Sequence, residues 1–298
     1  MTTGHYEFPE IVPLSPRQEM AGRALRNPGF HIGLFIVSVT LLCALFSPLI
    51  APHDPYVQDL AGKLKPPVWD AGGSWEHIFG TDTLGRDLLS RIVYGARVTM
   101  VVGFGTAILS GAIGSLIGIC GGYFGGRIDA FVVFLTNVKL AMPGVLLALS
   151  LVSIFGGSLF TITLIVGLLF WDRFAIVTRT ATQQIRAQEF VMAAEFAGAS
   201  WTRIILREIL PNVMNQIIVV ASLEMAIAIL VEASLSFLGV GLQPPTPSWG
   251  LLVSEGRAFM FFKPYLIMIP GLAIFIVVVG INLLGDGLRD IMAPQGRR

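Results

Sequence analysis

Long apolar stretches alternate with shorter polar ones along most of the chain. Six of the apolar stretches are each long enough for a helix to cross a bilayer: about residues 30–51, 98–120, 130–154, 158–174, 215–238 and 265–284. Pro52 and Pro55 close the first stretch, and Lys139 and Pro143 interrupt the third. The pattern predicts an all-α integral membrane protein with six transmembrane helices. Residues 1–29 would form an N-terminal arm, 30–290 the transmembrane domain and 291–298 a short tail.

The composition supports a membrane location and narrows the choice of partners. The chain is 54% hydrophobic and only 13% charged, with a mean hydropathy of +0.75, whereas a soluble domain carries roughly 25% charged residues. The net charge is only +1, so the sequence gives no reason to expect a basic surface that would bind nucleic acid. The first apolar stretch follows a long polar arm, so we expect no cleavable signal peptide. Cys43 and Cys120 both fall inside apolar stretches, which favours buried, reduced thiols over a disulfide.

The distribution of basic residues predicts the orientation in the membrane. If the N-terminus lies in the cytoplasm, twelve of the 20 Lys and Arg residues lie on the cytoplasmic side and seven on the opposite side. Positive residues favour the cytoplasmic side of a membrane protein. We therefore expect both termini, and the polar segment 192–211, to lie in the cytoplasm, within reach of a soluble partner.

Segment 192–211 is amphipathic and rich in small residues, although it lies between two apolar stretches. One predicted helical face carries Phe190, Ala193, Ala194 and Ala197, and a second carries Trp201, Ile204, Ile205 and Ile209. Gly198 is expected to break the first helix, Ser200 to cap the second and Pro211 to end it. Such a helical hairpin suits docking into a groove on a soluble protein. The alternative is an amphipathic linker that lies on the membrane surface.

The same segment resembles the EAA loop of ABC importer permeases. Ala193, Ala194, Gly198, Leu210 and Pro211 match the family pattern at the right spacing. Met192 stands where the family has Glu, and Glu208 stands at an Ile position. Three further segments resemble the C-type permease subunit of dipeptide, oligopeptide and nickel importers: GTDTLGRDLLSRIVYGAR at 80–97, EASLSFLGVGLQPPTPSWG at 232–250 and NLLGDGLRD at 282–290.

The resemblance implies the type I ABC importer permease fold, in a bacterial cytoplasmic (inner) membrane. It implies four partners: a homologous B-type permease, two cytoplasmic ABC ATPase subunits that bind ATP and Mg, and an extracytoplasmic substrate-binding protein. The cytoplasmic EAA-type loop would couple to the ATPase through Met192, Ala193, Ala194, Gly198, Trp201, Arg203, Arg207, Glu208 and Pro211. The substrate would be a di- or oligopeptide, with nickel, glutathione or another small solute as alternatives. A secondary transporter and a receptor-like membrane protein are the more distant alternatives.

Chemistry within the chain itself is not expected. The sequence contains no G-x-x-x-x-G-K-[ST] loop for ATP, and neither a Ser–His–Asp set nor a carboxylate pair can be proposed, so we expect no catalytic residues and no cofactor. The four histidines show no metal-ligand spacing, so we expect no metal site. Thr81, Asp82, Arg86 and Asp87 are predicted to form a charge-paired turn around Gly80 and Gly85. Trp249 is predicted to anchor at the membrane interface.

Three charged residues fall inside the predicted spans. A charge at the centre of a membrane helix costs about 2.5–3.5 kcal/mol on insertion scales, so it normally faces a cavity or a partner. Lys139, Glu224 and Glu232 therefore line a translocation path, or form an ion pair between Lys139 and one glutamate, or extend toward the membrane surface from near the end of a span. For Glu232, near the end of its span, we favour a structural role.

Overall fold

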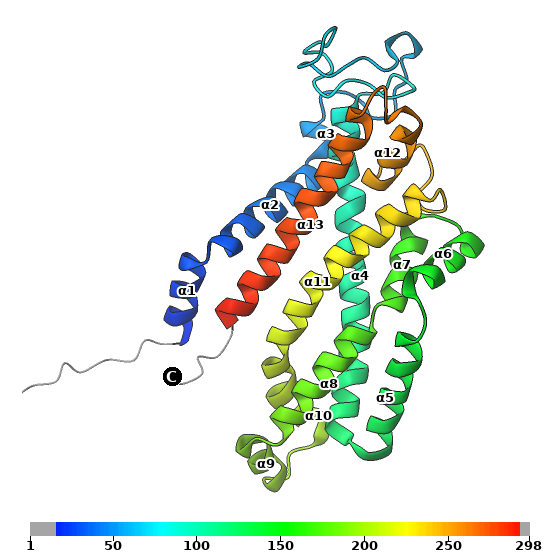
Figure 1. Ribbon diagram of the computed structural model, residues 1–298. Coiled ribbons are helices and arrows are strands. Elements are labelled where there is room, and N and C mark those ends of the chain that lie inside the picture. Colours follow the sequence, from blue (N-terminus) through cyan, green and yellow to red (C-terminus); the bar gives the residue numbers. More distant parts are fainter. Residues whose placement is uncertain (1–15, 293–298) are drawn as a thin grey trace, which may run out of the picture.

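The computed structural model describes residues 16–292 and shows an elongated bundle of helices (Figure 1). The first fifteen residues of the predicted arm and the last six of the predicted tail lie outside the described residues. The α-helices are α1 (Pro16–Arg26), α2 (Pro28–Leu45), α3 (Ser47–Ile50), α4 (Leu88–Phe124), α5 (Gly126–Leu140), α6 (Gly144–Phe155), α7 (Leu159–Leu169), α8 (Asp172–Arg186), α9 (Glu189–Phe196), α10 (Trp201–Ile204), α11 (Leu210–Phe237), α12 (Trp249–Gly256) and α13 (Tyr265–Met292). Short 3₁₀ turns cover Leu60–Gly62 and Arg257–Phe259, and a π-helical turn covers Ile205–Ile209.

The helices confirm an all-α membrane fold. Within the described residues 16–292, five helical stretches are long and apolar enough to cross a bilayer, or six if the bent pair α5–α6 counts as one span. The helices of this pair meet at 77° around a break at 141–143, next to Pro143. Within residues 16–292 the only strand-like contact is an isolated bridge between Thr81 and Asp87.

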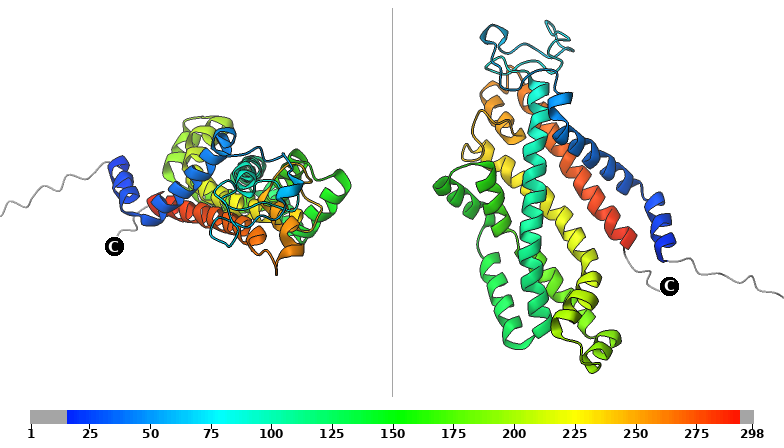
Figure 2. Two further views of the ribbon diagram at one scale, coloured as in Figure 1. Left: turned by 90° about the horizontal axis from the view of Figure 1, so that it is seen from above. Right: turned by 180° about the vertical axis from the view of Figure 1, so that it is seen from behind.

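Helix α4 lies in the middle of the bundle, and the other spans pack around it (Figures 1 and 2). Small residues allow this close packing. A Cβ atom added at Gly114 would lie 2.6 Å from the Cβ of Phe174, and one at Gly118 would lie 2.9 Å from the Cα of Ala175. Because lipid tails give helices no hydrophobic reason to associate, such close backbone approach is the main route to helix contact in a membrane.

Two membrane helices extend well beyond their apolar stretches. The predicted span 98–120 lies inside the 37-residue helix α4, which begins where the Asp87 side chain caps the backbone N–H of Ser90. All but the last residue of the predicted span 215–238 belongs to a continuous helical stretch of 37 residues, Trp201–Phe237. The prediction that Pro211 ends the second helix of segment 192–211 is therefore wrong. Pro211 lies in the first turn of α11, where a missing N–H is tolerated, directly after the π-helical turn.

A buried cluster of charges holds the long loop 51–87 against the helices. The Asp82 carboxylate lies 2.6 Å from Nε of Arg86 and 2.6 Å from Nη1 of Arg91. Arg91, fully buried, also lies 2.5 Å from the carboxylate of Glu255 in α12. This geometry confirms the predicted charge-paired turn at Asp82 and Arg86. Gly85 has a φ of +77°, which favours glycine at the turn.

Trp249 does not anchor at the membrane interface, and that prediction is wrong. Its side chain is buried, and its indole N–H donates a hydrogen bond of 2.8 Å to the carbonyl of Ile92 in α4. Gly95 makes room for it, because a Cβ atom there would lie 2.6 Å from the indole ring. A buried Trp needs a partner for its N–H, and a backbone carbonyl supplies it here.

Replacing Asp82 with Asn tests whether the charge cluster holds the loop. We expect Asp82→Asn to lower the unfolding temperature of the purified protein in detergent substantially, because removing one partner of a buried ion pair costs about 3–5 kcal/mol. Glu255→Gln should have a smaller effect, since the Glu255 side chain is 21% exposed. Asp70→Asn, at an exposed acid in the same loop, is the control. Equal unfolding temperatures for Asp82→Asn and Asp70→Asn would contradict the assigned role.

Candidate functional site

Helices α9 and α10 form a hairpin at the end of the bundle opposite loop 51–87 (Figure 1). Gly198 ends α9 with a φ of +76°, which confirms the predicted break. The N–H of Gly198 donates to the carbonyl of Glu195 at 3.0 Å, and that of Ala199 donates to the carbonyl of Ala194 at 3.1 Å. This pair of bonds is the Schellman motif, which favours glycine at that position. Ser200 occupies the N-cap position of α10, but its side chain makes no capping bond there.

Buried aliphatic side chains hold the hairpin against the bundle. Val191, Ile204 and Ile209 are almost fully buried and pack in one cluster with Ile119 and Tyr123 of α4. The predicted faces are therefore only partly right. Ile204 and Ile209 are buried as expected, but the residue that α9 buries is Val191, which the predicted face omitted. A short helix shows little periodicity, so its buried face depends on the neighbouring helices.

Most of the predicted contact residues are exposed to solvent. Those exposed are Met192, Ala193, Gly198, Trp201, Arg203, Arg207 and Pro211, whereas Ala194 and Glu208 are partly buried. The ring of Trp201, 54% exposed, meets the edge of Phe124 with a centroid distance of 5.6 Å. Phe196 is 92% exposed and was not predicted as a contact residue. An exposed aromatic side chain at a hairpin tip is typical of a protein-binding surface.

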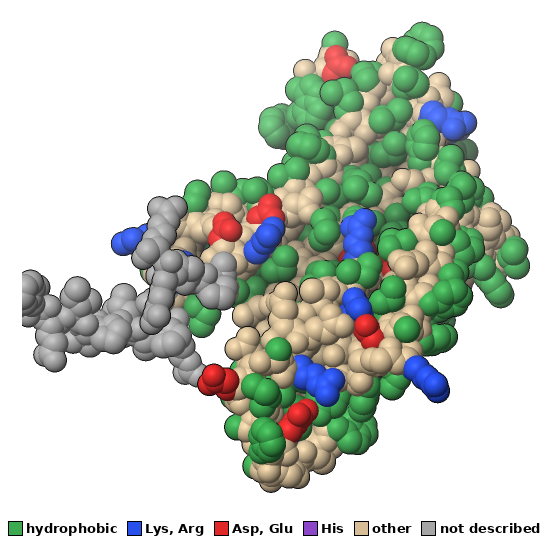
Figure 3. All heavy atoms as spheres, turned by 60° about the horizontal axis from the view of Figure 1, so that its bottom comes forward, with side chains coloured by type: hydrophobic (Ala, Val, Ile, Leu, Met, Phe, Trp, Pro, Cys, Tyr) green, Lys and Arg blue, Asp and Glu red, His purple; other side chains and the backbone are tan. Residues whose placement is uncertain are grey.

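A hollow of about 230 Å³ lies between the two arms of the hairpin. It is lined by Ala194, Ala197, Gly198, Ala199, Arg203, Ile204 and Glu208. Small residues allow a partner's backbone to approach closely, and the two charged residues can bind polar groups. Figure 3 brings this end forward and shows Lys and Arg side chains interspersed with Asp and Glu, whereas the flank of the bundle is largely hydrophobic. The hairpin is thus chemically suited to a soluble protein partner.

The intramembrane charges form pairs that the sequence did not predict. Lys139 Nζ lies 2.8 Å from a carboxylate oxygen of Asp172, so the alternative in which Lys139 pairs with a glutamate is wrong. Glu224 instead lies 3.4 Å from Nε of Arg173. Asp172 and Arg173 begin α8 directly after a short interruption of the helix at 170–171, and they approach the other two residues from there.

The buried carboxylate of Glu224 has fewer hydrogen-bond partners in the described part of the chain than that of Glu232. Its side chain is fully buried, and neither carboxylate oxygen accepts a hydrogen bond from the described residues 16–292. Glu232, 2% exposed, accepts a bond of 2.8 Å from the Ser236 hydroxyl, which itself accepts from the N–H of Leu242. Glu232 thus contributes to the turn that follows α11, whereas Glu224 is a buried charge with one distant partner. Buried charges of that kind are commonly functional in membrane proteins.

Two family models match the chain. Residues 89–298 match the binding-protein-dependent transport system inner membrane component, and residues 15–67 match the N-terminal TM domain of oligopeptide transport permease C. The first match covers α4 to α13, which include the hairpin and both intramembrane charge pairs. The second covers α1, α2 and α3 and the start of the long loop.

Several curated relatives are similar to the chain over nearly their whole length. The chain is 39% identical over 285 residues to the dipeptide transport system permease protein DppC of Haemophilus influenzae, covering 96% of this chain and 97% of the relative. It is 41% identical over 284 residues to the protein of the same name in Escherichia coli, covering 95% of each. It is 37% identical over 287 residues to the di/tripeptide transport system permease protein DppC of Pseudomonas aeruginosa, covering 96% of this chain and 95% of the relative. With its helical fold and exposed hairpin, the chain belongs to the family of binding-protein-dependent transport system inner membrane components.

Proposed function

We propose that this chain is the C-type permease subunit of an ATP-driven ABC importer that carries di- and oligopeptides across the cytoplasmic membrane. The observation that carries the proposal is identity of 37–41% with dipeptide and di/tripeptide permeases over at least 95% of both chains. The partners in this proposal are a homologous B-type permease, two cytoplasmic ATPase subunits that bind ATP and Mg, and an extracytoplasmic substrate-binding protein.

The hairpin α9–α10 is the proposed contact with an ATPase subunit, at the cytoplasmic end. Two features support this role. The hollow between its arms is lined mainly by alanine and glycine, together with the charged Arg203 and Glu208. The hairpin is held to the bundle by the buried Val191, Ile204 and Ile209. A rigid base allows the hairpin to move as a unit with the bundle when the ATPase closes.

Helix continuity offers a route from the hairpin into the membrane. Because Pro211 does not end the second helix, α10 runs through the π-helical turn into α11 without a loop. Movement of the hairpin would thus be transmitted directly to the helix that carries Glu224. The translocation path then alternates between inward-open and outward-open states at the contact with the second permease.

Lys139 and Glu224 are the proposed lining residues of that path. Each lies in a charge pair at the meeting of α5, α8 and α11, and their partners Asp172 and Arg173 are adjacent in the chain. The Arg173 side chain is 48% exposed in the isolated chain, so this group of charges reaches the surface of the subunit. A group of positive and negative side chains can bind both the ammonium and the carboxylate terminus of a short peptide. Glu232, bonded to Ser236, is assigned to the scaffold.

Gly198→Leu tests the hairpin. We expect it to abolish ATP-dependent dipeptide uptake into proteoliposomes while the two permeases still assemble. A non-glycine residue at this φ costs about 1–2 kcal/mol, and its side chain would enter the proposed contact surface. Co-purification of the ATPase should weaken in parallel.

A matched control is available at the other end of the same helical stretch. Gly239 follows α11 with a φ of +82°, and its N–H donates to the carbonyl of Ser236, as in the motif at Gly198. An added Cβ meets nothing within 4 Å at either glycine. Gly239→Leu therefore carries the same backbone cost and should retain ATPase binding. Normal ATPase binding by Gly198→Leu would rule out the proposed contact.

A pair of variants separates path lining from simple charge pairing at Lys139. Lys139→Ala leaves the Asp172 carboxylate, 4% exposed, without its cation, so it should reduce both protein yield and uptake. Lys139→Ala combined with Asp172→Ala removes the unpaired charge and should restore yield. If Lys139 lines the path, uptake per molecule stays low in the double variant. Full recovery of uptake would assign the pair to the scaffold.

A further inference from the structure

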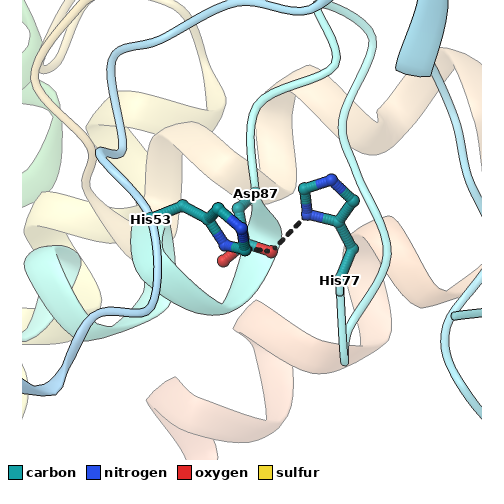
Figure 4. A group of neighbouring side chains, drawn as sticks. All are labelled: His53, His77 and Asp87. Carbon is teal, nitrogen blue, oxygen red and sulfur yellow. Dashed lines mark hydrogen bonds and ion pairs between the residues drawn. The ribbon is translucent and has the colours of Figure 1, made fainter. Parts of the chain in front are cut away.

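Two histidines and a carboxylate from three separate parts of the long loop meet near the start of α4 (Figure 4). His53 follows α3, His77 lies in the second half of the loop, and Asp87 is the N-cap residue of α4. Their candidate ligand atoms all lie within 4.8 Å of one another. Sequence spacing gave no sign of this group, because the loop returns on itself between the two histidines.

The distances suit a tetrahedral metal ion. Nδ1 of His77 lies 3.0 Å from Oδ1 of Asp87, and Nδ1 of His53 lies 3.8 Å from the same oxygen. Bonds of about 2.0–2.2 Å to a tetrahedral Zn²⁺ place neighbouring ligand atoms about 3.3–3.5 Å apart. Each nitrogen-to-oxygen distance thus lies within about 0.5 Å of this range. The widest separation within the group is up to 4.8 Å, so one histidine side chain would move by about 1 Å to complete the coordination.

A second layer of hydrogen bonds already orients the ligands. The N–H and the hydroxyl of Ser90 donate to Oδ2 of Asp87 at 2.8 and 2.7 Å, which leaves Oδ1 facing the histidines. The Ser90 hydroxyl also accepts from the backbone N–H of His53 at 3.0 Å. One serine thus fixes both the carboxylate and the chain at His53. Outer-layer bonds of this kind are a regular feature of metal sites.

A purely structural hydrogen bond would account for His77 but not for His53. The bond from His77 to Asp87 satisfies both groups. Nδ1 of His53, however, is shielded from solvent and has no hydrogen-bond partner among the described residues, although it points at the same carboxylate. Its ring lies 4.8 Å, centroid to centroid, from that of His77. Within residues 16–292, Nδ1 of His53 thus has no hydrogen-bond partner, although it lies beside a second imidazole and a buried carboxylate. A bound cation would supply the missing partner.

We propose that His53, His77 and Asp87 bind a divalent transition-metal ion, and that Zn²⁺ is the ion their chemistry suits best. Two imidazole nitrogens disfavour Mg²⁺ and Ca²⁺, which prefer oxygen ligands. Three protein ligands leave a fourth position, and the His53 side chain, 37% exposed, gives access from solvent. The ion would join three segments of the loop at the start of α4. This proposal does not depend on the transported substrate.

The test is Zn²⁺ binding by the purified, chelator-stripped transporter, with an affinity tag free of histidine. We expect one Zn²⁺ per chain by calorimetry, with a rise in unfolding temperature as the ion is added. His53→Asn should weaken Zn²⁺ affinity at least tenfold and remove that rise. Because the bond between His77 and Asp87 remains, the metal-free unfolding temperature should stay unchanged.

Two further variants test whether the imidazole of His53 itself supplies a ligand. His31→Asn, at a histidine in α2, should bind Zn²⁺ like the unaltered protein. His53→Cys supplies a thiolate in place of the imidazole and should restore binding, with the visible absorption of a tetrahedral thiolate complex when Co²⁺ replaces Zn²⁺. Equal Zn²⁺ binding by the unaltered protein and His53→Asn, or no binding by either, would overturn the proposal.

Discussion

A cluster of two arginines and two carboxylates determines how the long loop meets the membrane-spanning helices. Arg91 is fully buried in the first turn of α4, where it lies beside Asp82 of the loop and Glu255 of α12. None of these charges could be buried alone, so each requires the others to be in place. The cluster therefore fixes the loop, α12 and α4 relative to one another. Helix α4 in turn contacts most of the other spans.

The apolar stretches predicted where the helices lie, because a bilayer leaves the backbone few alternatives to a helix. They did not predict where the helices end. Helix α4 begins well before its apolar stretch because Arg91 is neutralised by partners distant in sequence. Pro211 does not end a helix because a π-helical turn precedes it. Neither the ion pairs of Arg91 nor the π-helical turn before Pro211 can be predicted from the local pattern of apolar and polar residues.

The same limit applies to the candidate site. Matches to the family pattern identified the hairpin, and the break at Gly198 followed from its conformational freedom. The partner of Lys139 could not be predicted, since Asp172 lies near the end of an apolar stretch, on a different helix and far from Lys139 in the sequence. The prediction for Trp249 relied on the general enrichment of tryptophan at the membrane interface. The space beside Gly95 and a hydrogen bond to the backbone carbonyl of Ile92 determine its position instead.

The proposed contact surface for the ATPase lies at one end of a long, unbroken helical stretch, from Trp201 to Phe237. At about 1.5 Å per residue, its 37 residues span about 55 Å. Tilting a rigid helix of that length by about 5° around one end displaces the other end by about 5 Å, which is close to the rise of one helical turn. In the proposed coupling mechanism, a modest rotation at the hairpin would thus become a displacement of several ångströms at the opposite end of the helix.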